Sequence, residues 1–222
     1  MGVSLKKPLL NDLIVKSLED FFTNQSFKYK KKYNQFEKIK DDYRYIYNIQ
    51  MAAWSYGFSI SVKLYIEQKQ IENVYEKILG KSNRLTLGNT LQRIYNSPDG
   101  REVVSSGTMD INIINDSDVE AAIESLEDFY NRIAKPYYEK YQDMKSIDDI
   151  INNPPFENCP ADVGGIFADR CMKGLIVARF VNNPNYEQLV KIYDEAIKET
   201  MHVQSIESYY KVREHLIYNP IK

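Results

Sequence analysis

The chain has 222 residues, of which 43% are apolar and 27% charged, the composition of an ordinary globular protein. It holds eighteen tyrosines but only two histidines, two cysteines and one tryptophan. Because side chains that titrate near neutral pH or bind soft metals are this scarce, the composition disfavours a zinc site and a disulfide framework. We expect no metal and no cofactor. The tyrosines supply large rings with one polar end, which suit half-buried packing surfaces.

The formal net charge of −2 hides an uneven distribution along the chain. Residues 1–50 carry ten Lys or Arg against six Asp or Glu, whereas residues 110–157 carry four against twelve. The charge therefore disfavours nucleic-acid binding by the chain as a whole and favours a local acidic surface. No apolar signal segment follows Lys7, and no apolar run approaches the roughly 18 residues of a membrane span. We expect a soluble, cytoplasmic protein with no membrane association.

The N-terminal part is expected to be a helix followed by strands. Apolar side chains at helical spacing predict a helix over residues 8–23, and residues 27–36 are expected to be extended. Alternating apolar residues over 43–51 and 58–66, joined by a turn at 55–57, predict an antiparallel hairpin. The intervening side chains of the second strand are mostly polar, so we expect one wet face and one face covered by helices.

The middle of the chain is expected to continue in the same mixed pattern. A short helix over residues 71–79 is predicted to end at Gly80, which tolerates the left-handed conformation. Two further strands are expected near 85–95 and 103–114, joined by a tight turn at residues 97–100.

A long helix is predicted to start at residues 117–120, which have the form of a capping box. Pro136 is expected to kink this helix because it removes one backbone donor. Its apolar stripe comprises Val119, Ala122, Ile123, Leu126, Tyr130, Ile133 and Tyr137.

The composition shifts to Asn, Pro, Asp and Gly before three last helical patterns. We interpret residues 151–165 as a loop that connects an α+β domain, residues 1–150, to a helical subdomain, residues 166–222, packed on it. The helices are expected over residues 166–181, 185–201 and 205–218. The fold class is therefore α+β, an antiparallel sheet of about five strands with helices on one face and a C-terminal helical subdomain.

The candidate binding residues are Glu120, Glu124 and Glu127, which share one exposed side of the long helix. Repulsion between like charges one turn apart costs a few tenths of a kcal/mol per pair. The positive end of the helix dipole offsets Asp118 and Glu120 but reaches the later carboxylates poorly. A basic protein partner is therefore a hypothesis for this surface.

The other chemically interesting residues have simpler interpretations. Cys171 sits on an apolar helix and is expected to act as a small hydrophobe. His202 and His215 stand thirteen positions apart, outside any metal motif, with His215 in solvent if Ile206, Tyr210, Arg213 and Ile217 face inward. Trp54 and Tyr56 at the hairpin tip are open to two interpretations, a binding loop or, as is more common for a single aromatic tip, rings that pack on their own sheet. Acidic pairs such as Asp148 with Asp149 resemble cap residues, so we assign no catalytic residue.

The segment Phe27-Lys28, Phe36, Ile49-Gln50 and Phe58-Ser59-Ile60-Ser61-Val62 resembles an uncharacterised bacterial family, the domain of unknown function with the serial forty-three-zero-four. The match spans fewer than fifty residues in the N-terminal third, and Ser26 stands where that family prefers glycine. The resemblance implies an α+β fold but no established activity. Some relatives look like components of toxin and antitoxin loci.

Three functional hypotheses follow. The first is a non-enzymatic binding protein, an immunity-type inhibitor that presents its acidic helix face to a basic partner. The alternative is a hydrolase-like enzyme with a cleft lined by Tyr, Asp and Arg between the sheet and the helical subdomain. A second alternative is a nucleic-acid binder, because lysines interleave with Tyr29 and Tyr33 over residues 28–33.

Overall fold

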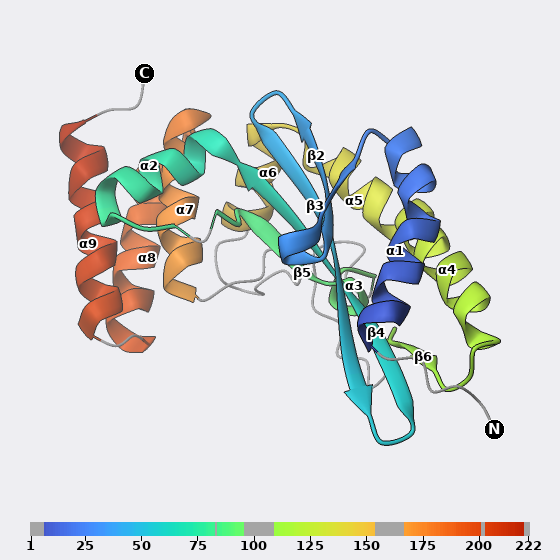
Figure 1. Cartoon of the computed structure of the whole chain (residues 1–222). Helices are drawn as coiled ribbons and strands as arrows, with labels where there is room; N and C mark the ends of the chain where they lie inside the picture. Colours follow the sequence, from blue (N-terminus) through green and yellow to red (C-terminus); the bar gives the residue numbers. More distant parts are fainter. Residues whose placement is uncertain (1–6, 83, 96–108, 154–166, 201–202, 220–222) are drawn as a thin grey trace.

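An antiparallel sheet forms the centre of the computed structural model, which describes residues 7–82, 84–95, 109–153, 167–200 and 203–219 (Figure 1). Its described strands are β1 (Lys28–Lys30), β2 (Gln35–Lys40), β3 (Tyr43–Trp54), β4 (Gly57–Gln68), β5 (Leu87–Thr90) and β6 (Ile111–Ile113). The order is β1-β2-β3-β4-β5, and β6 pairs with β4 near the hairpin turn. The expected α+β fold is confirmed, with six described strands instead of about five.

The β3–β4 hairpin gives the sheet two different faces. On one face, buried apolar pairs cross the two strands: Tyr45 opposite Ile66, Tyr47 opposite Leu64, and Ile49 opposite Val62. On the other face, Ser61, Lys63 and Tyr65 of β4 are only half-buried. The alternation in the sequence therefore translates directly into one covered and one polar face.

Helices α1 (Lys7–Asn24), α4 (Asp118–Phe129) and α5 (Lys135–Lys140) cover the apolar face. Phe22 of α1 stacks on Phe36 with ring centroids 4.2 Å apart and lies 4.9 Å from the ring of Tyr47. Fully burying a large apolar side chain contributes roughly 1.5–3 kcal/mol, so this layer provides much of the core energy.

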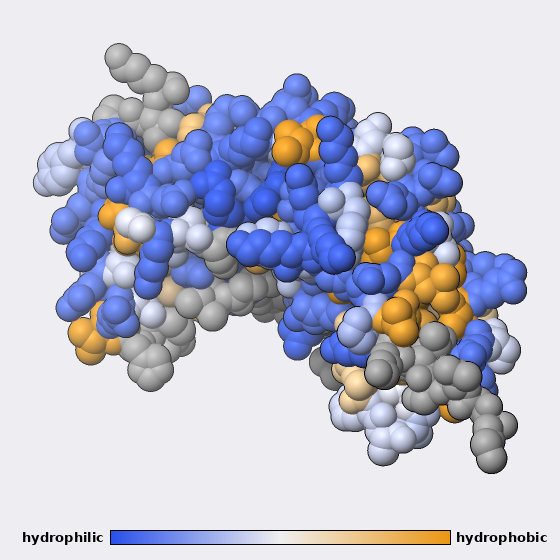
Figure 2. Space-filling model, in the orientation of Figure 1, coloured by the Kyte–Doolittle hydropathy of each residue, from blue (hydrophilic) through white to orange (hydrophobic). Residues whose placement is uncertain are grey.

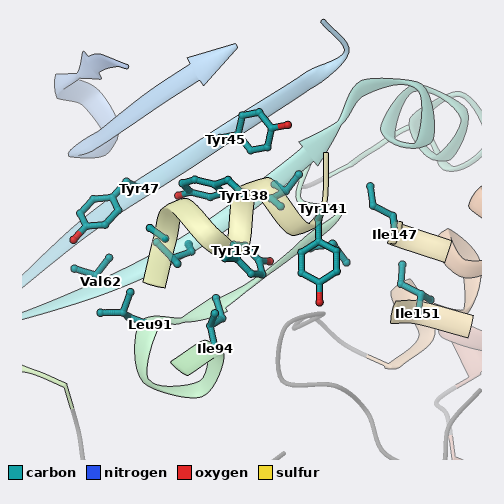
Figure 3. Packing of buried hydrophobic residues seen from close by; sticks show 14 of the residues in the cluster. Tyr45, Tyr47, Val62, Leu91, Ile94, Tyr137, Tyr138, Tyr141, Ile147 and Ile151 are labelled. Carbon is teal, nitrogen blue, oxygen red and sulfur yellow. The ribbon is translucent and has the colours of Figure 1, made fainter. Parts of the chain in front are cut away.

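Much of the tyrosine content is explained by this core (Figure 3). The hydroxyl of Tyr47 donates to the carbonyl of Leu126 at 2.9 Å, and that of Tyr138 donates to the carbonyl of Ile46 at 2.7 Å. Each ring therefore buries apolar area while its polar end reaches a backbone acceptor.

The long helix predicted from residue 118 is interrupted before Pro136. After α4, a π-helical turn (Tyr130–Ala134) precedes α5. Proline lacks the amide donor and crowds the carbonyl four residues back, and the wider turn relieves this crowding. The predicted apolar stripe is confirmed, with Ile123 half-buried and the other six residues buried.

Helix α2 (Lys69–Leu79) ends as predicted at Gly80, whose φ is +72°. The strand expected over residues 85–95 is wrong in its second half, because Leu91 and Ile94 bury their side chains at helical spacing in α3 (Leu91–Tyr95). The predicted turn at residues 97–100 lies outside the described residues.

The C-terminal helices α7 (Phe167–Phe180), α8 (Tyr186–Thr200) and α9 (Val203–Tyr218) confirm the three predicted patterns and follow α6 (Met144–Asn152). The buried face of α9 consists of Tyr209, Val212 and Leu216, one position before the predicted residues Tyr210, Arg213 and Ile217. This rotation of the helix leaves His215 half-buried and not in solvent. The connecting loop falls largely outside the described residues, and the domain boundary stays a prediction. None of the described helices is long and apolar enough to cross a membrane.

Candidate functional site

The acidic residues of α4 lie on the side of the helix away from its buried stripe. Glu120 and Glu124 are exposed and Glu127 is half-buried. None of these three carboxylates forms an ion pair or hydrogen bond with another described residue. In contrast, Asp128 accepts two hydrogen bonds of 2.8 Å from Arg132, one turn further along. The carboxylates of Glu120, Glu124 and Glu127 therefore keep their mutual repulsion, which a basic partner would relieve.

Asp118 shapes the start of α4. Its carboxylate accepts hydrogen bonds from the backbone amides of Ile114 and Asn115, each at 2.8 Å. The bond from Asn115, followed by that from Ile114, lowers the pKa of Asp118. The predicted capping box is wrong, because Ser117 is itself in a helical conformation and makes no capping bond with its side chain.

The tip of the β3–β4 hairpin projects beyond the helix layer (Figure 1). Trp54 and Tyr56 are 56% and 62% exposed there. The expectation that these rings pack on their own sheet is wrong, since the neighbouring tip residues Ala52 and Ala53 are exposed as well and offer little surface to pack against. Exposed aromatic rings of this kind are typical anchors for a partner protein.

Ile114 joins the hairpin tip to the start of α4. Strand β6 pairs Ile113 with Phe58, and a Cβ atom on Gly57 would lie 2.3 Å from the Ile113 carbonyl oxygen and 3.2 Å from the Ile114 Cα. Glycine is required at this close approach, where φ is also +155°. Ile114 is 61% exposed, and its backbone lies beside Gly57 of the hairpin and is bonded to Asp118 at the start of α4. Figure 2 shows the hairpin tip in pale colours at the lower end of the molecule, below a mostly blue surface.

The opposite end of the hairpin is held by a network of paired charges on the polar face. Arg44 and Glu67 are cross-strand partners with nitrogen and oxygen 2.5 Å apart, and Arg84 binds the second oxygen of Glu67 at 2.6 Å. Arg44 also lies 3.4 Å from Glu37 of β2. Because Glu37 and Glu67 are buried, each needs these charged partners.

A second set of paired charges continues from α2 into α7. The Lys173 ammonium of α7 lies 2.8 Å from a carboxylate oxygen of Glu72 and donates to the Leu85 carbonyl at 2.8 Å. Thr86 and Ser82 donate to the same carboxylate at 2.7 and 2.5 Å. Glu72 and Lys173 are 0% and 3% exposed, so this ion pair joins the sheet side of the molecule to its C-terminal helices.

The proposed enzymatic cleft was expected at this same junction. Tyr75 of α2 donates to Asp169 of α7 at 2.7 Å, and burial, followed by that hydrogen bond, raises the pKa of Tyr75. Tyr75 and Asp169 thus bond to each other across the α2–α7 junction. The hydrolase-like alternative stays a prediction.

The two members of the acidic pair Asp148 and Asp149 have different environments. Asp148 is 1% exposed and accepts hydrogen bonds from the amides of Asn152 and Asn183, both at 2.7 Å. Asp149 is exposed and pairs with Lys145. The expectation that Asp148 and Asp149 are cap residues is wrong, because Asp143 caps the helix by accepting from the Ser146 amide at 2.8 Å.

The scarce reactive residues do not meet in one site among the described residues. Cys171 is 1% exposed, and burial raises the pKa of its thiol to about 12, which suits a hydrophobic packing role. Cys159 and His202 lie outside the described residues. Within the described ranges, no group of three or more His, Cys, Asp or Glu side chains is arranged to hold a metal ion.

The basic segment over residues 28–33 is not one continuous strand. It ends as β1 at Lys30 and turns into a 3-10 helix (Lys31–Tyr33). Tyr29 is half-buried and donates to Asn34 at 2.7 Å, whereas Tyr33 is exposed. The expected strand geometry is therefore wrong, and the nucleic-acid alternative stays a prediction.

Comparison of the chain with known proteins identified no relative. No family model, no curated protein and no solved structure matches the chain. The resemblance of the N-terminal third to the bacterial domain of unknown function thus stays a prediction, and the functional argument depends on the site itself.

Proposed function

We propose that this protein is a non-enzymatic binding protein of the immunity type, which holds a basic protein partner on its projecting end. This binding end consists of Trp54, Tyr56, Ile114, Glu120 and Glu124. The observation that carries the proposal is that Trp54, Tyr56 and Ile114 are exposed around the hairpin tip. Helix α4, which is bonded to Ile114 through Asp118, carries exposed carboxylates without a described partner.

The apolar part of the binding end supports a protein partner. Aromatic side chains dominate the energy of many interfaces because they bury a large area with little loss of conformational freedom. Trp54 is the only tryptophan of the chain, and more than half of its surface is exposed. A partner that covers Trp54, Tyr56 and Ile114 would remove this apolar area from water.

The acidic part supports a basic partner. Glu120 and Glu124 are one helical turn apart on a helix that Val119, Ala122 and Leu126 fix against the core. Their carboxylates are therefore positioned by a packed element. A positively charged partner surface would relieve their repulsion and accelerate association.

The immunity-type role extends the resemblance to relatives that look like parts of toxin and antitoxin loci. In that role the partner is a basic toxin, and the inhibitor acts by covering its surface. We keep the cytoplasm as the proposed compartment, because a buried free thiol at Cys171 suits reducing conditions.

Charge reversal on α4 tests the proposal. The partner is captured from a lysate of the source cells with the intact chain, identified, purified and titrated against variants. The double variant Glu120→Lys/Glu124→Lys is expected to weaken the affinity by about tenfold or more at low salt, with a smaller effect at physiological salt.

The matched control is Glu195→Lys/Glu199→Lys on α8, an exposed pair with the same spacing on another helix. This control is expected to leave the affinity unchanged. Equal affinities for the two double variants, or failure of the chain to retain any basic protein, would remove the proposal.

A further inference from the structure

A pocket of about 210 Å³ opens on the side of the sheet that carries the helices, away from the hairpin tip. Phe27, Tyr45, Tyr130 and Tyr138 form its floor, and each of these rings is at most 7% exposed. Pockets for drug-sized ligands have roughly 300–1,000 Å³, so this one suits a smaller molecule.

Three lysines line the pocket, and two of them, Lys38 and Lys40, come from the end of β2. Phe36, Lys38 and Lys40 alternate on the core face of β2, and Lys38 is the direct partner of Tyr45. Described β1 pairs only with residues 35–37 of β2, so Lys38 and Lys40 lie on a free edge beside the aromatic floor.

Lys135, at the start of α5, lines the pocket from the helix side, where Glu139 is the one carboxylate among its lining residues. The lining charges are thus three positive against one negative. Gln25 and Gln142 add amide groups. Donors therefore outnumber acceptors, which favours an anion.

Two tyrosine hydroxyls in the floor have no structural role. Tyr45 and Tyr130 are 5% and 3% exposed, yet neither hydroxyl has a hydrogen-bond partner among the described residues. The neighbouring Tyr47 and Tyr138 hydroxyls both bind backbone carbonyls. Figure 3 shows the Tyr45 hydroxyl pointing away from Tyr47 and Tyr138. Neither hydroxyl oxygen is itself among the buried polar atoms without a partner, so both are accessible to solvent and available to a ligand.

We propose that this pocket binds a small phosphate monoester with a planar ring. Lys38, Lys40 and Lys135 surround the phosphate, the hydroxyls of Tyr45 and Tyr130 donate to its oxygens, and the ring lies against the aromatic floor. Burial raises the pKa of Tyr130 to about 12, so its hydroxyl stays protonated and remains a donor at neutral pH.

Three probes distinguish the parts of this ligand. In phosphate-free buffer, the ¹⁵N-labelled chain is titrated with phenyl phosphate, inorganic phosphate and phenol. Phenyl phosphate is expected to cause saturable shifts of the amides in residues 38–45 and 130–142. Inorganic phosphate is expected to shift the same amides with weaker affinity, and phenol is expected to leave them unchanged.

Conservative variants test the assigned groups. Tyr130→Phe keeps the ring and is expected to weaken phenyl phosphate binding by about three- to tenfold, the effect of one neutral hydrogen bond. Lys135→Gln is expected to weaken it by about tenfold or more. Glu139→Gln is expected to strengthen it, because it removes the opposing charge. Lys211→Gln on α9 is the remote control and leaves the affinity unchanged.

The proposal is overturned if none of the three probes causes a saturable shift, or if Tyr130→Phe and Lys135→Gln behave like Lys211→Gln. In that case the lysines only protect the free edge of β2 from pairing with other chains. Unchanged urea midpoints of the variants show that any loss of binding does not come from unfolding.

Discussion

The β3–β4 hairpin has two ends, and they lie in opposite surroundings. At the α2 end, Arg44 pairs with the buried Glu67, and a second pair, Glu72 with Lys173, is buried on both sides and reaches α7. At the turn end, Trp54 is exposed and the carboxylate of Glu120 has no described partner. The same two strands therefore connect a region of paired charges with a region where described carboxylates lack an ion pair.

This difference separates residues that hold the fold from residues that do not. An unpaired charge in the interior costs several kcal/mol, so the buried end tolerates only paired groups. At the surface, water satisfies a carboxylate until a partner replaces it. Unpaired polar groups and exposed rings at the turn end therefore have no role in stability that the structure reveals, and binding is the simplest use for them.

The largest expected effect on stability comes from breaking the buried ion pair between Lys173 and Glu72. Lys173→Met leaves Glu72 charged and without its ammonium partner, and we expect a loss of about 3–5 kcal/mol in the free energy of unfolding, measured with urea. Adding Glu72→Gln is expected to recover part of this loss, because it removes the unpaired charge. The comparison of the two ends fails if Lys173→Met costs no more than Lys211→Met on the surface.

The corresponding change at the exposed end acts on binding. Trp54→Ala is expected to leave the free energy of unfolding within about 0.5 kcal/mol of the parent. The same variant is expected to weaken the captured partner's affinity by about 2 kcal/mol or more, the size of an interface anchor. A large loss of stability with intact binding contradicts this assignment.

A smaller change separates hydrogen bonding from charge in the buried end. Thr86→Val removes the hydroxyl that donates to Glu72 and accepts from the Gln68 amide at 2.9 Å. We expect a loss of about 1–3 kcal/mol, because two buried groups lose a partner. A double-mutant cycle with Lys173→Met measures how strongly the two sites are coupled, and additive effects would show that no common network exists.

Alkaline pH tests the buried core between the two ends. Burial raises the pKa of Cys171 from 9.0 to about 12 and that of Tyr130 from 10.0 to about 12. Groups with a raised pKa stabilise the folded state fully below their unfolded pKa and lose this contribution as the pH rises to the folded value. We expect the free energy of unfolding, measured with urea, to be flat near neutral pH. It is expected to fall by about 1.4 kcal/mol per pH unit for each group, above about pH 9 for Cys171 and above about pH 10 for Tyr130. Cys171→Ala is expected to delay the onset, and an unchanged onset contradicts the role of the thiol.

The smallest expected effect joins stability and binding at the exposed end. Glu124→Gln removes the like-charge contacts with Glu120 and Glu127 on α4 and is expected to stabilise the fold by about 0.2–0.5 kcal/mol per contact. It is also expected to weaken partner binding. Circular dichroism during thermal unfolding measures the first effect and partner titration the second, with Glu199→Gln on α8 as the control. Improved binding in Glu124→Gln contradicts a basic partner.

Much of the fold was predictable because it follows from local periodicity. The hairpin, the stripe of α4 and the three C-terminal helices all appear as repeated apolar spacings. Local signals failed where two plausible patterns compete. Residues 117–120 look like a capping box, but the Asp118 carboxylate accepts hydrogen bonds from amides of the preceding loop instead. Residues 91–95 fold as a helix because Leu91 and Ile94 reach the core that way.

The candidate sites were predictable only in part. Glu120 and Glu124 were identified by their spacing opposite the apolar stripe. The roles of Trp54 and Ile114 depend on β6, which pairs beside the hairpin tip across more than fifty residues of sequence. The aromatic pocket had one signal in the sequence, namely that Lys38 and Lys40 continue the inward-facing alternation begun by Phe36.

By itself, the amino-acid sequence determined the fold class, the apolar faces and the acidic character of α4, because these depend on the spacing of side chains within one helix or strand. Only the tertiary structure decided which charges are paired and which hydroxyls remain free. That distinction depends on distances between residues far apart in the chain, such as Glu72 and Lys173, and the free energy of a charge or hydroxyl depends on whether a partner or water surrounds it.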